Sequence, residues 1–219
     1  MLIAVSPEKI QLPLGTIVRF PGTWKDYQAL GKLLGESPLP KVKYRTGEIL
    51  LMSPISPAHG RKAALVAKII DAVLSYLDKP NESFTPITIK LPEISGFEPD
   101  YCFYIDNYEF AVGRDCIDWE TDPPPDLAVE VDVTSYTDIA DYLPYRIPEV
   151  WLIKGEGLII NQYQEDSQVY IEVEESMYFP SINIKQAIAY CFFAAKVQPS
   201  SLVMQELKKM LSRNEFRNF

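Results

Sequence analysis

Asp100, Glu130 and Asp132 are carboxylates that lie in two apolar segments of the sequence. The second segment, Leu127-Ala-Val-Glu-Val-Asp-Val133, predicts a strand with its valines on one face and both carboxylates on the other. The segment contains no Lys, Arg or His, and an ionised carboxylate inside a sheet is costly without a cationic partner. Converging carboxylates suit a hard divalent metal ion, which prefers oxygen ligands. The pattern therefore favours a metal-dependent hydrolase.

Each of these carboxylates also has a structural interpretation. Asp100, which follows a proline, could simply begin a strand at its end that faces solvent. Asp132 could pair with a Lys or Arg of a neighbouring strand, because buried ion pairs also place carboxylates in apolar surroundings. Glu130 is harder to explain in this way, since Glu is rarely buried in valine-rich sequence without a partner.

The elements that must position these residues alternate between strands and helices. We expect, in order, a hairpin over 41–52 that turns at Thr46-Gly47, a helix over 58–77, strands over 84–91, 100–105 and 127–134, a short helix over 137–145, strands over 150–153, 158–163 and 169–173, and two helical pieces from 184 that Pro199 separates. This order predicts the α/β (α+β) class, with a mixed sheet flanked by helices. We expect one domain over 1–219, with an N-terminal arm over 1–40 and a C-terminal helical extension over 181–219.

Composition narrows the class of protein. Of the 219 residues, 47% are hydrophobic and 23% charged, which is typical of a globular protein. The net charge of −9 does not favour non-specific nucleic-acid binding, which depends on Lys and Arg, although it allows a local basic patch. Three dispersed cysteines match no zinc pattern and indicate a reducing compartment. With neither a secretory signal nor an apolar stretch of roughly 20 residues, we expect a cytoplasmic protein without a membrane span.

Several segments in order resemble one known family. They are Gly47-Glu-Ile-Leu-Leu-Met-Ser-Pro54 with His59, then Pro99-Asp100, Pro125-Asp-Leu-Ala-Val-Glu-Val-Asp-Val-Thr-Ser135 and Ile147-Pro-Glu-Val-Trp-Leu152. Over about residues 25–165 the chain resembles the restriction-endonuclease-like family of domains of unknown function DUF820, within the PD-(D/E)XK nuclease superfamily. The resemblance implies a restriction-endonuclease-like fold and hydrolysis of DNA phosphodiester bonds with Mg²⁺ or Mn²⁺.

Site residues follow from the same resemblance. It implies that Asp100 and Glu130 bind the metal ion, with Asp132 as a further ligand or an acceptor behind the ligands. Glu48 could approach the metal through water, and His59 could carry a proton or contact a phosphate, whereas a local structural role is the alternative for both. Tyr142 matches a family tyrosine that is expected to pack the short helix.

One departure from the family pattern bears on activity. Asp132 stands where the superfamily has its lysine, and Asp138 stands where many relatives carry a relocated lysine. Lys90 or Arg146 could supply a cation from elsewhere. Two hypotheses follow: a DNA endonuclease that works as a homodimer, because cutting both strands needs two sites, and an inactive nuclease-fold protein that serves as a binding or assembly module.

Overall fold

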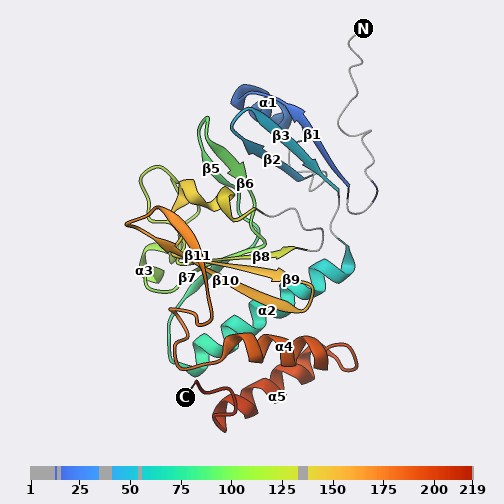
Figure 1. The fold of residues 1–219 in the computed structure, drawn as a ribbon, viewed down its shortest axis with the longest axis vertical. Helices are drawn as coiled ribbons and strands as arrows, with labels where there is room; N and C mark the ends of the chain where they lie inside the picture. The colour runs from blue at the N-terminus through green and yellow to red at the C-terminus, as the bar shows by residue number, and fades with distance from the viewer. Residues whose placement is uncertain (1–12, 14–15, 35–40, 54–55, 133–137, 219) are drawn as a thin grey trace. The chain divides into compact units, whose positions relative to one another are not determined.

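Two compact units make up the chain in the computed structural model, which describes residues 13, 16–34, 41–53, 56–132 and 138–218. Unit 1 comprises Met1–Pro57 and Thr88–Glu98, and unit 2 comprises Ala58–Ile87 and Pro99–Phe219. The α+β class predicted from the sequence is confirmed, since both units combine strands with helices (Figure 1). The prediction of a single domain stays a prediction.

Unit 1 holds an antiparallel sheet of five strands in the order β1-β3-β2-β6-β5. Its elements are β1 (Ile17–Pro21), α1 (Trp24–Leu34), β2 (Lys41–Arg45), β3 (Glu48–Met52), β5 (Ile89–Leu91) and β6 (Ser95–Phe97). The predicted hairpin is confirmed as β2 and β3, and Gly47 turns it with a φ of 81°, a value that glycine adopts without steric cost. Of the predicted N-terminal arm, 1–12, 14–15 and 35–40 lie outside the described residues, whereas β1 pairs with β3.

Unit 2 holds a mixed sheet of six strands in the order β11-β10-β9-β8-β7-β4. Its elements are α2 (Pro57–Tyr76, whose first residue is counted with unit 1), β4 (Glu82–Phe84), β7 (Tyr101–Tyr104), α3 (Tyr108–Ala111), β8 (Leu127–Asp132), the 3-10 helix η2 (Ile139–Tyr145), β9 (Glu149–Lys154), β10 (Gly157–Gln164), β11 (Val169–Val173), α4 (Ile184–Ala194) and α5 (Ser200–Ser212). β8 and β9 run parallel and the other pairs run antiparallel. The predicted mixed sheet is therefore confirmed.

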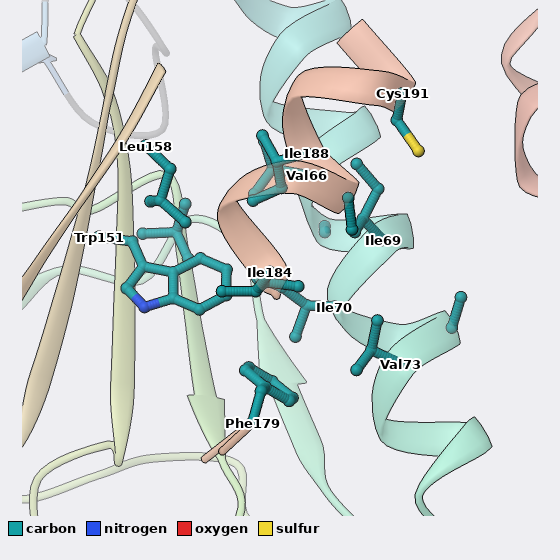
Figure 2. Packing of buried hydrophobic residues seen from close by; sticks show 14 of the residues in the cluster. Val66, Ile69, Ile70, Val73, Trp151, Leu158, Phe179, Ile184, Ile188 and Cys191 are labelled. Carbon is teal, nitrogen blue, oxygen red and sulfur yellow. The ribbon is translucent and has the colours of Figure 1, made fainter. Parts of the chain in front are cut away.

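The core of unit 2 lies between one face of this sheet and the helices α2 and α4. Figure 2 shows Trp151 of β9 and Leu158 of β10 close to Val66 and Ile70 of α2, with Ile188 of α4 beside them. β8 contributes its alternate residues Leu127, Val129 and Val131 to the same core. The residues between them, including Glu130, are therefore directed to the opposite face of the sheet.

One predicted strand is wrong. The segment 84–91 was expected to be continuous, but it divides into β4 of unit 2 and β5 of unit 1. Pro86 lies at the break, and a proline has no N–H to donate to a strand ladder. Pairing between β5 and β6 then takes the chain through unit 1 before β7 returns it to unit 2.

Candidate active site

Asp100 and Glu130 come from neighbouring antiparallel strands of unit 2. Tyr101 of β7 pairs with Val129 of β8, so the same register extended by one residue places Asp100 opposite Glu130. Directly opposed residues of an antiparallel pair have Cβ atoms about 4.5–5.5 Å apart. Two of the three carboxylates that the sequence singled out therefore lie at facing positions on neighbouring strands.

The Asp100 side chain is buried, and both the backbone of β8 and His59 contact its carboxylate. Its Oδ2 accepts a hydrogen bond of 2.9 Å from the backbone N–H of Val131, and its Oδ1 lies 3.0 Å from Nε2 of His59. Because a carboxylate oxygen accepts, His59 carries a proton on Nε2 in this contact. His59 lies in the first turn of α2, so the start of this helix and the backbone of β8 together fix the direction of the carboxylate.

Glu130 contacts the short helix that follows its strand. Its Oε2 accepts a hydrogen bond of 3.2 Å from the hydroxyl of Tyr142 in η2, a side chain that is fully buried. Burial, followed by the negative charge of Glu130, raises the pKa of Tyr142 well above its usual value. The same two causes raise the pKa of the buried Cys102 thiol. Tyr142 therefore remains a neutral hydrogen-bond donor to Glu130, and Cys102 remains a neutral thiol.

The structure says less about the other two predicted site residues, Asp132 and Glu48. Asp132 ends β8 and its backbone pairs with Lys154 of β9, but its side chain lies outside the described residues. Glu48 begins β3 in unit 1, whereas the two opposed carboxylates belong to unit 2. The roles of Asp132 and Glu48 stay predictions, as do the catalytic and metal-binding roles of Asp100, Glu130 and His59.

The donor set at this site fits a small, hard cation. Mg²⁺ prefers oxygen donors, keeps several waters and is commonly held by one or two carboxylates together with substrate phosphates. Asp100 and Glu130 supply two such carboxylates from facing positions. Within the described part of the chain, no group of three or more His, Cys, Asp or Glu residues could hold a metal ion. The two described carboxylates therefore fit an ion that takes further ligands from water and substrate.

The structure describes the three positions at which a cation was considered, which are 138, 146 and 90. The side chain of Asp138, at the position of the relocated lysine, caps η2 by accepting a hydrogen bond of 3.0 Å from the backbone N–H of Ala140. Arg146 ends η2 in a left-handed conformation, and Lys90 lies in β5 of unit 1.

Comparisons with known proteins identify the family of this chain. A family model, Uma2, described as "Putative restriction endonuclease", matches residues 24–186. The chain belongs to the Uma2 family. A crystal structure of a putative nuclease belonging to DUF820 from Anabaena variabilis ATCC 29413 is similar, with a TM-score of 0.47 and 15% identity over 71% of this chain and 86% of that one. No match was found among curated proteins.

Family membership confirms the predicted resemblance, and two contacts go beyond what the sequence indicated in this Uma2 chain. Tyr142 was expected to pack its helix, but its hydroxyl also binds Glu130, twelve residues earlier. His59 was considered for proton transfer or phosphate contact, roles that stay predictions, and the structure shows it in contact with Asp100, 41 residues later. Nothing in the local sequence of either residue marks these partners.

Proposed function

We propose that this Uma2 protein is a metal-dependent endonuclease that hydrolyses phosphodiester bonds of DNA at Asp100 and Glu130. The observation that carries the proposal is the facing placement of these two carboxylates, one buried and one in contact with a buried hydroxyl, in a member of a restriction-endonuclease family.

Asp100 and Glu130 would hold Mg²⁺ or Mn²⁺, with Asp132 as a further candidate ligand. A bound ion of this kind supplies a water of lowered pKa and polarises the scissile phosphate. His59 and the backbone N–H of Val131 fix the orientation of the Asp100 carboxylate, and the Tyr142 hydroxyl fixes that of Glu130. These contacts reduce the reorganisation that the carboxylates need when substrate arrives.

The first prediction concerns the two carboxylates. Glu130→Gln and Asp100→Asn should each reduce Mg²⁺-dependent cleavage of a plasmid by more than about 100-fold, because changes behind the ligands of metal sites already cost 10–100-fold. Calorimetric titration with Mn²⁺ should show weaker binding by both variants. Glu172→Gln, a matched change on the exposed part of β11, should behave like the unchanged protein. A protein that binds neither Mg²⁺ nor Mn²⁺ would contradict the proposal.

The second candidate function is an inactive nuclease-fold protein that binds DNA or assembles with a partner. Aspartates at positions 132 and 138, where a lysine is expected, favour it. This candidate predicts that DNA binds without being cut at stoichiometric protein and saturating Mn²⁺. Cleavage that requires metal and is lost in Glu130→Gln would exclude it.

A further inference from the structure

A cation from another strand could replace the missing lysine. β8 and β9 pair in parallel, with Glu130 beside Leu152 and Asp132 beside Lys154. We propose that Lys154 supplies the positive charge at the scissile phosphate, through a contact between its ammonium group and a non-bridging phosphate oxygen. This inference rests on the proposed nuclease function and assigns a further catalytic residue to it.

The alternation of side chains places Lys154 on the face of the sheet that carries Glu130. Trp151 and Ile153 of β9 belong to the core shared with α2 and α4, as do Val129 and Val131 of β8. Residues between them in each strand point to the other face, and paired residues of parallel strands share a face. Lys154 therefore projects from the same face as Glu130.

The distance between Glu130 and Lys154 also suits the approach of both residues to one phosphate group. Adjacent strands lie about 4.8 Å apart and two residues span about 6.6 Å along a strand, so the Cα atoms of Glu130 and Lys154 are about 8 Å apart. Lysine carries its ammonium on a flexible four-carbon stem. A phosphate group that approaches the Glu130 carboxylate through a metal ion would therefore lie within reach of Lys154.

Lys154 differs from two other described lysines near this end of the sheet, Lys62 and Lys196, whose side chains have partners. Nζ of Lys62 donates to the carbonyl oxygen of Gly155 and lies 5.5 Å from the centre of the Phe192 ring. Nζ of Lys196 forms an ion pair of 2.8 Å with Glu156. Lys154 is exposed, and among the residues that the structure describes its side chain has no hydrogen bond, ion pair or ring contact.

The other candidate cation in unit 2 is less well placed. Arg146 precedes β9, at the end where Glu149 pairs with Leu127. Glu130 and Asp132 lie toward the opposite end of that pairing, where Lys154 ends β9. The register therefore favours Lys154 over Arg146.

The chemical role that we propose for Lys154 is to supply positive charge, without a transfer of its protons. In the proposed hydrolysis, the oxygen of a water molecule bonds to phosphorus and one phosphorus–oxygen ester bond breaks. Water gives up one proton to solvent, and the leaving oxygen takes up a proton to become a hydroxyl group. The Lys154 ammonium keeps its own protons throughout and stabilises the negative charge that builds on the non-bridging oxygens.

Single-turnover cleavage at saturating DNA and Mg²⁺ tests the proposal. Lys154→Met should cut about 100- to 1,000-fold more slowly, the usual effect of removing one charge-stabilising donor, and Lys154→Arg should recover most of the rate. Lys196→Met removes an exposed ion-paired lysine near the same turn and should stay within about threefold. Lys154→Met should still bind Mn²⁺ like the unchanged protein in calorimetry. A Lys154→Met rate equal to that of Lys196→Met would overturn the proposal.

A second measurement does not depend on cleavage. With Ca²⁺ in place of Mg²⁺, a short DNA duplex should protect Lys154 from acetylation, read by mass spectrometry, more strongly than it protects Lys196. Protection of Lys154 in a protein that never cuts would support the phosphate contact while the proposed nuclease function fails. Equal acetylation of Lys154 with and without the duplex would overturn the contact, whatever the activity.

Discussion

At the scale of residues, the site depends on how two acidic side chains are held. Asp100 is 8% exposed, and its carboxylate contacts the backbone N–H of Val131 and the imidazole of His59. Hydrogen bonds to a charged group contribute more to stability than those between neutral groups, and a buried acceptor that loses its donor is costly. The His59 contact therefore stabilises the fold and also fixes the orientation of the Asp100 carboxylate.

Removal of the imidazole should have a measurable cost. His59→Ala should lower the free energy of unfolding by about 1–3 kcal/mol, because Asp100 loses a donor. Arg61→Ala, an exposed change two residues later on α2, should alter it by less than about 0.5 kcal/mol. Urea titration followed by circular dichroism measures both. Equal stabilities of the two variants would show that the contact contributes nothing to the fold.

At the scale of elements, the buried carboxylate of Glu149 connects the sheet to the segment that leads into α4. Glu149 of β9 is fully buried and accepts hydrogen bonds from Trp151 Nε1 at 2.6 Å, Ser176 Oγ at 2.5 Å, the Met177 backbone N–H at 2.9 Å and Gln162 Nε2 at 3.2 Å. The Pro-Glu-Val-Trp segment, which resembles a family motif, thus has a structural use. It connects β9, the strand that carries Lys154, to β10 and to the segment around Ser176.

Loss of the Glu149 carboxylate should strongly lower the free energy of unfolding. Glu149→Ala leaves several buried donors without an acceptor, each costing about 1–3 kcal/mol, so unfolding should become easier by at least about 3 kcal/mol. Glu149→Gln, which keeps one acceptor oxygen, should fall between this variant and the unchanged protein. Glu165→Ala, in the exposed turn after β10, is the matched control for urea unfolding. A small effect of Glu149→Ala would mean that water replaces the lost acceptor.

At the scale of the whole molecule, no helix in the described part of the chain is long and apolar enough to cross a membrane. The homodimer predicted from the need to cut both strands stays a prediction, which sedimentation equilibrium can test.

Within unit 2, the fully or nearly buried tyrosines 104, 142 and 178 share one electrostatic property. Burial is the largest cause that raises the pKa of each above the usual value of 10.0.

These tyrosines predict a loss of stability in alkali. Above about pH 10 the unfolded chain loses tyrosine protons that the folded chain retains, so the free energy of unfolding falls as pH rises. Their contribution is complete below the unfolded pKa and is lost as pH rises toward the raised values in the folded protein. Urea unfolding at about pH 8, 9.5 and 11 measures the trend, and Tyr142→Phe should flatten it. A free energy of unfolding that does not change over this range would contradict the prediction.

The sequence by itself determined the features that depend on near neighbours. Alternating valines around Glu130 predicted a strand and the face that its carboxylate takes, and Gly47 predicted the hairpin turn. Apolar spacing predicted α2, and Pro199 predicted the division between α4 and α5. These patterns reflect local backbone preference and the burial of one face, which neighbouring residues specify.

Only the tertiary structure decided which distant residues meet. The contacts of His59 with Asp100 and of Tyr142 with Glu130, and the pairing of Lys154 beside Asp132, join residues that the chain separates widely. They depend on the register and direction of strand pairing, and a shift of one residue would turn each side chain to the opposite face. Because no local pattern fixes that register, the sequence singled out the carboxylates as candidates but could not identify the residues that contact them or the lysine of the neighbouring strand.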